Sequence, residues 1–288
     1  MKNENSASGS PGAMDARAII LSLNLWPEAP RIDPIPAGFT NENFRVFAGG
    51  QAYFARAGSD LPHHGISRRQ EARCAGIAAR AGIAPEVIHA RDGVLVTRFI
   101  EGRALALGQT PTEATLASIA ELLAVVHRQA APPDLEETDL VRVCKRYLSL
   151  PGGRRLAGAE RGRIERLLEK APRLGPECLV HGDAFPENFI DDGRRLWLVD
   201  WEYAGRGHPA TDIAYAAMNF DLSGERLRAF VKPHGGSVEM DAVRELMPVA
   251  AARDFLWCLS EIETRGLTEA LAGFTELCRR RLDSAPSV

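Results

Sequence analysis

Three polar side chains in the second half of the chain have the types and the spacing that phosphoryl transfer needs. Asp183 follows a short apolar run, Asn188 comes after four intervening residues, and Asp200 ends the next apolar run. A carboxylate can orient or deprotonate an acceptor hydroxyl, and carboxylate and amide oxygens hold Mg²⁺ against phosphates. The sequence therefore predicts Asp183 as the catalytic residue, and Asn188 and Asp200 as metal ligands.

The spacing around Asp183 is typical of a known catalytic loop. His181, Asp183 and Asn188 form the pattern H-x-D-x-x-x-x-N that marks the catalytic loop of kinases. The alternative interpretation is a pair of Asp-containing turns that follow strands without any catalytic role. The second carboxylate, Asp200, at the end of the following apolar run favours the catalytic interpretation.

A longer run around these residues resembles a known family. The segments LVHGDAFPENFI and LWLVDWEYAGRGHPATDIAY are similar to the choline/ethanolamine kinase branch of the aminoglycoside phosphotransferase-like, protein-kinase-like superfamily. The run D-W-E-Y-A-G, which begins at Asp200, is the more specific part. The resemblance covers about residues 34–282 and implies ATP and Mg²⁺ as cofactors. It also implies structural roles for His181 and Asp212, which would hold the catalytic loop.

The same resemblance implies a nucleotide site in the first third of the chain. A turn with glycine and short polar side chains can present backbone N–H groups to phosphate oxygens. Arg56 ends a predicted strand and would neutralise phosphates, with Glu71 as its ion-pair partner; alternatively, Arg56 is a surface residue at a strand end. The full set of predicted nucleotide-binding residues is Gly38, Thr40, Asn41, Asn43, Arg56, Glu71, Phe99 and Ile100.

The acceptor is the least specified part of the predicted reaction. The resemblance implies choline as the leading acceptor, with ATP and a small alcohol as the partners. A quaternary ammonium group calls for aromatic faces and a nearby carboxylate. The predicted acceptor-binding residues are Glu202, Tyr203, Tyr215 and Trp257, which could instead belong to the core. Asn219 and Ser260 depart from the choline kinase pattern. Ethanolamine, thiamine or an aminoglycoside therefore remain alternatives, as does a pseudokinase-like module that binds nucleotide without turnover.

The order of the predicted elements indicates a small α+β lobe followed by a larger, mainly helical lobe, and the resemblance implies that this α+β, two-lobed fold is protein-kinase-like. We expect a disordered lead over residues 1–14, a nucleotide-binding lobe with an antiparallel sheet over 15–101, and a larger, mainly helical catalytic and acceptor-binding lobe over 102–288. Predicted helices cover 15–25, 70–81, 111–129 (with Thr110 as N-cap), 142–150, 158–171, 241–265 and 267–281. Predicted strands cover 43–47, 52–57, 87–90, 94–99, 178–180, 189–190 and 196–199, while 27–36 is an extended connection.

Composition excludes several other classes of protein. The chain has 288 residues and a net charge of −3, so no basic excess points to nucleic acid. The five cysteines contain no C-x-x-C spacing, which argues against a disulfide framework or a zinc site and favours the cytoplasm. No apolar run is long enough to span a membrane. No feature of the sequence predicts the oligomeric state.

Overall fold

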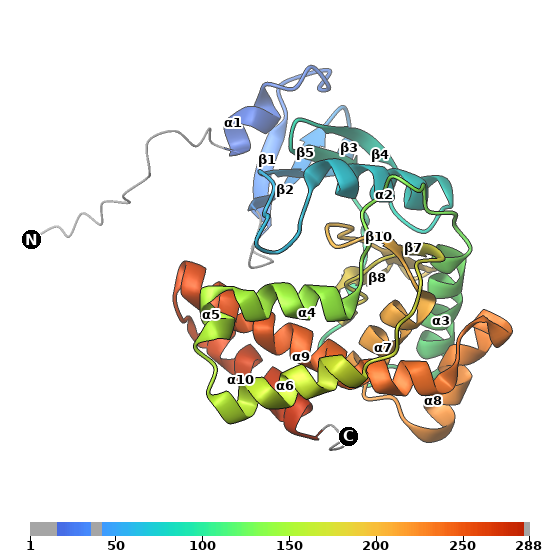
Figure 1. Ribbon diagram of the computed structural model, residues 1–288. Helices are drawn as coiled ribbons and strands as arrows, with labels where there is room; N and C mark the ends of the chain where they lie inside the picture. The colour runs from blue at the N-terminus through green and yellow to red at the C-terminus, as the bar shows by residue number, and fades with distance from the viewer. Residues whose placement is uncertain (1–15, 36–41, 285–288) are drawn as a thin grey trace, which may run out of the picture.

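A five-stranded antiparallel sheet with one long helix forms the first part of the molecule (Figure 1). The computed structural model describes residues 16–35 and 42–284. The strands are β1 (Arg31–Ile35), β2 (Glu42–Ala48), β3 (Gln51–Ala57), β4 (Val87–Arg91) and β5 (Val94–Arg98), and their order in the sheet is β1-β2-β3-β5-β4. Helix α2 (Arg68–Arg80) connects β3 to β4, and α1 (Ala16–Leu21) packs on β3.

Helices dominate the rest of the chain. They are α3 (Glu113–His127), α4 (Leu140–Ser149), α5 (Pro151–Arg154), α6 (Gly158–Lys170), α7 (Pro209–Asn219), α8 (Gly224–Val231), α9 (Met240–Arg265) and α10 (Glu269–Ser284), with the 3₁₀ helices η1 (Pro186–Asn188) and η2 (Lys232–Ser237). Two small sheets lie among them, one made of β7 (Cys178–Val180) and β10 (Gly205–Gly207), the other of β6 (Arg103–Ala104), β8 (Phe189–Asp191) and β9 (Leu196–Leu198). Helix α9 packs against α4, α7 and α10.

The predicted extended connection over residues 27–36 was wrong in part, because it contains strand β1. Pro34 lies within this strand, opposite Phe44. Proline cannot donate a ladder hydrogen bond and is tolerated on edge strands. Among the strands of residues 16–35 and 42–284, β1 lies at the edge of the sheet and pairs only with β2, which explains why a proline-bearing segment can join it.

Several helix boundaries differ from those predicted. Helix α3 begins after Thr112, whose hydroxyl accepts a hydrogen bond from the backbone N–H of Thr115; the predicted N-cap, Thr110, was wrong. Helix α2 begins after Ser67 and α1 ends at Leu21, earlier than predicted in both cases. The N-cap residue decides the starts of α2 and α3, and neighbouring hydroxyl residues compete for that position.

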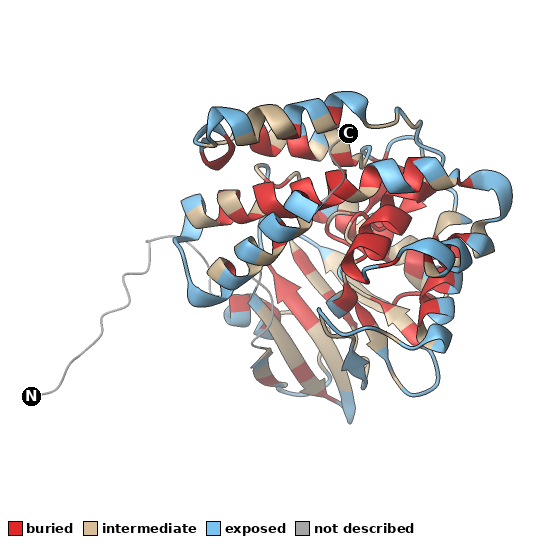
Figure 2. Ribbon diagram, turned by 90° about the horizontal axis from the view of Figure 1, so that it is seen from below, coloured by how far each residue is buried: buried red, intermediate tan, exposed pale blue. Residues whose placement is uncertain are grey.

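Helix α7 was missed entirely by the sequence analysis. All eleven of its residues are buried, and Figure 2 shows buried residues concentrated where the central helices meet. A helix that is buried all round has no amphipathic stripe, so hydrophobic periodicity does not reveal it. Among the described residues, no helix is long and apolar enough to cross a membrane. All five cysteines are buried free thiols.

Candidate active site

The predicted catalytic loop leaves strand β7 and is shaped by a glycine. Gly182 has a φ of +75°, and a Cβ atom built on it would lie 2.4 Å from the carbonyl oxygen of Tyr203. No other residue fits this close approach without moving the backbone. Gly182 therefore lets the loop pass directly under the segment that follows Asp200, and it places Asp183 beside that segment.

A buried carboxylate holds the start of this loop. Asp212, at the beginning of α7, accepts hydrogen bonds from the backbone N–H groups of His181 (2.7 Å) and Gly182 (2.8 Å) and from Nε2 of His127 (2.9 Å). Burial would raise the pKa of Asp212, but the hydrogen bond and charge of His127 and the proximity of His181 hold it below its usual value. Burial lowers the pKa of His181, and its Nε2 donates to the carbonyl oxygen of Val199 at 3.0 Å.

We expect Asp212→Ala to lower the free energy of unfolding by about 3 kcal/mol or more, because it leaves three buried donors without an acceptor. Urea unfolding of the wild type and the variant at neutral pH measures this difference. Asp241→Ala is the matched control: Asp241 is exposed and forms an ion pair with Arg244 on its own helix, so its loss should cost about 0.5 kcal/mol or less. Equal losses in the two variants would contradict a bracing role for Asp212.

Asp183 is held by two partners, one on each carboxylate oxygen. Nδ2 of Asn188 donates to Oδ2 at 3.0 Å, and Nη1 of Arg253 donates to Oδ1 at 2.9 Å. An ionised carboxylate has about four acceptor positions. Asp183 can therefore accept a further hydrogen bond from a substrate hydroxyl while both oxygens stay fixed.

The two predicted metal ligands flank the open end of the β8–β9 hairpin. The backbone N–H of Val199 donates to the carbonyl oxygen of Asn188 at 3.0 Å, which brings Asn188 next to the segment that carries Asp200. Nδ2 of Asn188 donates to Asp183, so its amide oxygen is left to accept. Asp200 has a φ of +65°, and its side chain is 42% exposed. These oxygen donors are of the kind that fits Mg²⁺.

Arg56 joins the sheet to the metal-ligand segment through a buried charge cluster. Its guanidinium forms an ion pair with Glu71 of α2, and it lies 3.4 Å from Glu202 and 4.0 Å from Asp200. Arg68 was not predicted to take part; it contacts Glu71 at 3.0 Å and Glu202 at 2.9 Å. Two arginines thus link α2, β3 and the segment after β9.

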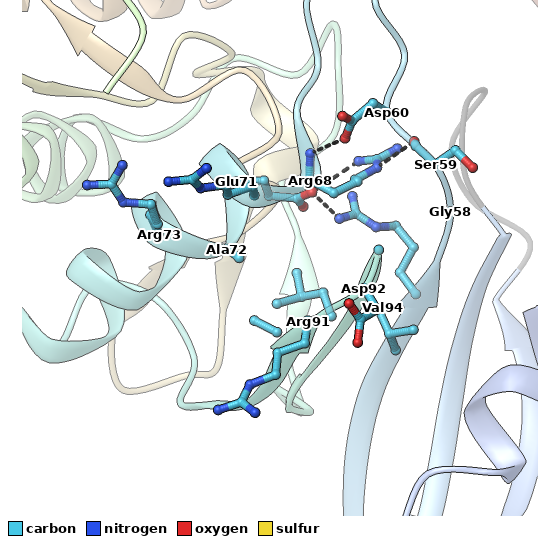
Figure 3. A pocket seen from close by; sticks show the side chains of 15 residues that line it. Gly58, Ser59, Asp60, Arg68, Glu71, Ala72, Arg73, Arg91, Asp92 and Val94 are labelled. Atoms are coloured by element: carbon cyan, nitrogen blue, oxygen red, sulfur yellow. Dashed lines mark hydrogen bonds and ion pairs between the residues drawn. The ribbon is translucent and has the colours of Figure 1, made fainter. Parts of the chain in front are cut away.

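A cavity of about 720 Å³ opens beside this cluster. It lies between α2, the loop after β3 and the turn that joins β4 to β5 (Figure 3). Figure 3 also shows Arg68 reaching toward Ser59 and Asp60, to which its side chain and backbone donate hydrogen bonds. The cavity lies at the start of β5, whereas the predicted adenine-binding residues Phe99 and Ile100 follow the end of β5.

Some of the remaining predicted nucleotide-binding residues lie outside the described part of the chain, and others lie in the sheet or at its end. Gly38, Thr40 and Asn41 lie outside the described residues. Asn43 lies in β2, directly opposite Arg56 of β3. The backbone N–H of Phe99 donates to the carbonyl oxygen of Ala52 at 3.1 Å, which ties the end of β5 to the adjoining strand.

The structure brings only some of the predicted acceptor residues to Asp183. The rings of Tyr203 and Tyr215 lie 4.6 and 5.1 Å from the guanidinium carbon of Arg253, which itself contacts Asp183. Glu202 instead belongs to the cluster around Arg68. Trp257 lies near Phe274, with ring centroids 6.2 Å apart.

Arg253, like Arg68, is a residue of the site that was not predicted from the sequence. It lies in α9, four residues before Trp257, and is only 5% exposed. A residue four positions away shares a helix face, so the predicted placement of Trp257 at the site was the one signal that could have drawn attention to Arg253.

Two histidines extend the hydrogen-bond network of Asp212, because His127 contacts both Asp212 and His234. Nδ1 of His127 lies 2.8 Å from Nε2 of His234. Burial and the neighbouring His127 lower the pKa of His234 to about 4, and burial also lowers the pKa of His181. A histidine with a lowered pKa binds a proton more readily in the unfolded chain. The stability it contributes is therefore present above pH 6.5 and decreases as the pH falls toward the lowered pKa.

We therefore expect the free energy of unfolding to decrease between pH 6.5 and pH 4.5, and His234→Gln to reduce this slope, because it removes one of the groups that take up protons on unfolding. Urea unfolding across this pH range gives the slope. His89→Gln, a change in partly exposed strand β4, is the control and should keep the wild-type slope. A wild-type slope in His234→Gln would show that His234 does not contribute.

Comparison with known proteins places these residues in context. Residues 31–246 match the phosphotransferase enzyme family described as APH. Protein LicA of Haemophilus influenzae is 26% identical over 200 residues, which are 65% of this chain and 58% of that protein. A choline/ethanolamine kinase family protein from Mesorhizobium loti is 26% identical, with a TM-score of 0.65 over 93% of this chain and 94% of the other.

A third relative extends the structural comparison. Choline kinase LicA from Streptococcus pneumoniae is 19% identical and superposes with a TM-score of 0.66 over 88% of this chain and 93% of the other. At this identity the likeness shows the fold alone. The predicted α+β, two-lobed kinase-like fold is confirmed, whereas the division of the chain near residue 101 stays a prediction.

Proposed function

Because the chain belongs to the phosphotransferase enzyme family, we propose that it transfers the γ-phosphoryl group of ATP to the hydroxyl of a small molecule. The observation that carries this proposal is the arrangement around Asp183. A fixed carboxylate, an amide and a second carboxylate lie at the ends of adjoining short strands. This is the set of groups that phosphoryl transfer between an alcohol and a nucleotide requires.

In the proposed step, the acceptor oxygen attacks the γ-phosphorus of ATP. A bond forms between that oxygen and phosphorus, and the bond from phosphorus to the bridging oxygen of ADP breaks. The proton of the hydroxyl passes to the carboxylate of Asp183, which Arg253 and Asn188 keep in place. The products are a phosphomonoester and ADP. Holding the hydroxyl in line with the phosphorus supplies much of the rate enhancement.

Asn188 and Asp200 would hold Mg²⁺, which would neutralise the phosphate charge that develops during transfer. We propose that Arg56 binds the same phosphates from the side of the sheet. Its ion pair with Glu71 fixes the position of the guanidinium, and Arg56 as a whole is buried, with 2% of its surface exposed. The backbone of Phe99 and Ile100 would bind adenine. The five buried free thiols favour a reducing compartment such as the cytoplasm.

The relatives favour choline as the first acceptor to test. One structural relative is described as a choline kinase and another as a choline/ethanolamine kinase family protein. Ethanolamine, thiamine and aminoglycosides belong in the same test. The contact between Asp183 and the cationic Arg253 favours a different class of acceptor.

The experiment is to measure ADP release with ATP and Mg²⁺ while alcohols of several classes are supplied one at a time. The proposal predicts that at least one alcohol raises ADP release well above the rate of ATP hydrolysis without acceptor. Binding of Mg·ATP with no transfer to any of a broad panel would instead favour a nucleotide-binding, pseudokinase-like module.

A further inference from the structure

Arg253 lies directly beside Asp183 and is held there by several contacts. Its Nη1 lies 2.9 Å from Oδ1 of Asp183 and 2.9 Å from Oδ1 of Asp254, and it donates to the hydroxyl of Tyr215 at 2.6 Å. The Tyr215 hydroxyl in turn donates to Asp254 at 2.7 Å. These contacts fix the guanidinium at the proposed catalytic carboxylate, in a place that is almost fully shielded from water.

The aromatic faces near Asp183 are already used by this guanidinium. Its carbon lies 4.6 Å from the ring centroid of Tyr203 and 5.1 Å from that of Tyr215. Both distances are within the range of about 6 Å over which a ring attracts a cation. The two tyrosines that could form a cage for a quaternary ammonium group therefore already have a cation at their faces.

The carboxylates that could attract a second cation are engaged as well. Asp183 and Asp254 both accept from Nη1 of Arg253. A choline molecule whose hydroxyl bonds Asp183 would bring its ammonium within about 6 Å of that carboxylate, because two carbons separate the two groups. Because the Arg253 guanidinium contacts the same carboxylate, the ammonium and the guanidinium would share one side of the site, and two positive charges near each other repel in a site with little water.

We propose that Arg253 is the specificity-determining residue of this site and that the acceptor is an uncharged alcohol, recognised by hydrogen bonds and not by an aromatic cage. The inference rests on the proposed function, because it takes Asp183 as the residue that receives the acceptor hydroxyl. Arg253 fills the place of the cation, and it also positions Asp183 for the hydroxyl. Polyols and sugars belong to the class of acceptor that this arrangement favours.

The first test uses the wild-type protein and two alcohols of equal shape. Choline is compared with its carbon isostere, in which a tert-butyl group replaces the trimethylammonium group. We expect kcat/KM for the isostere to be at least about ten-fold higher than for choline, because only choline meets the charge of Arg253. A preference for choline of ten-fold or more would overturn the inference and leave the kinase function intact.

The second test measures binding and does not depend on turnover. Tetramethylammonium is titrated into the wild type and into Arg253→Met by calorimetry. We expect no saturable binding to the wild type, and binding at least about ten-fold tighter to Arg253→Met, because the variant leaves two tyrosines and two carboxylates around a vacated position. Adding Tyr203→Ala to this variant should abolish the gain.

The matched control is Arg279→Met. Arg279 lies 5.0 Å above the ring of Phe255 and pairs with Glu160, away from Asp183. This variant should behave as the wild type in both tests. Tetramethylammonium binding to the wild type as tight as to Arg253→Met would refute the inference, as would failure of a folded Arg253→Met to bind it. Absence of transfer to every alcohol would instead refute the proposed function, while the binding result still decides the role of Arg253.

Discussion

Asp183→Asn should lower kcat by about 10²- to 10⁴-fold, because the amide cannot take the proton of the acceptor hydroxyl. The change is nearly isosteric, and the amide can still contact Asn188. The KM for ATP should stay within about two-fold of the wild-type value, since Asp183 is proposed to act on the acceptor and not on the nucleotide. Steady-state kinetics with the best alcohol of the panel measures both constants.

Asp241→Asn is the control for this change, because Asp241 is exposed on α9, the helix that carries Arg253, and forms an ion pair with Arg244. It should leave kcat unchanged. Thermal unfolding of both variants checks that the fold is intact. A folded Asp183→Asn with wild-type kcat would exclude Asp183 as the base and, with it, the proposed proton transfer.

The second large effect is expected at the metal-ligand segment. Asp200→Ala should reduce kcat by about 10³-fold or more and raise the Mg²⁺ concentration needed for half-maximal activity, because it removes the charged ligand that would hold the ion at the phosphates. Titration of Mg²⁺ at saturating ATP gives both quantities. The variant should fold, since the Asp200 side chain is 42% exposed and lies at the edge of the buried charge cluster.

A nearby carboxylate provides the comparison for Asp200. Asp192 lies in the turn between β8 and β9 and accepts a hydrogen bond from Nε1 of Trp197 at 2.7 Å. Asp192→Ala should keep the wild-type dependence on Mg²⁺. The metal assignment fails if Asp200→Ala has the same Mg²⁺ dependence as the wild type, or if Asp192→Ala loses as much activity.

The parts of the site that follow local sequence could be predicted. Asp183, Asn188 and Asp200 come directly from short apolar strands with fixed spacing, and the structure places them together at the ends of those strands. The ladder between β2 and β3 likewise follows from two alternating runs around a glycine turn. The Arg56–Glu71 ion pair joins two residues that the resemblance had paired, and the structure adds its contact.

The parts that depend on tertiary packing could not be predicted. Arg253 reaches Asp183 from a position 70 residues further along the chain. No local pattern specifies that contact. Helix α7, which carries Asp212 and Tyr215, is buried on every side and so lacks the periodicity that reveals surface helices. Asp212 and Tyr215 were predicted as site residues, but the helix that carries them and the contact of Arg253 with Asp183 were not.

The direct test of the central claim is a phosphorus NMR spectrum of the protein incubated with ATP, Mg²⁺ and a mixture of small alcohols that contains both charged ones, choline and ethanolamine among them, and uncharged polyols. The account predicts a phosphomonoester signal that grows in step with ADP and is absent with Asp183→Asn. Growth of ADP accompanied only by inorganic phosphate, or an equal phosphomonoester signal with Asp183→Asn, would contradict transfer to an alcohol at Asp183.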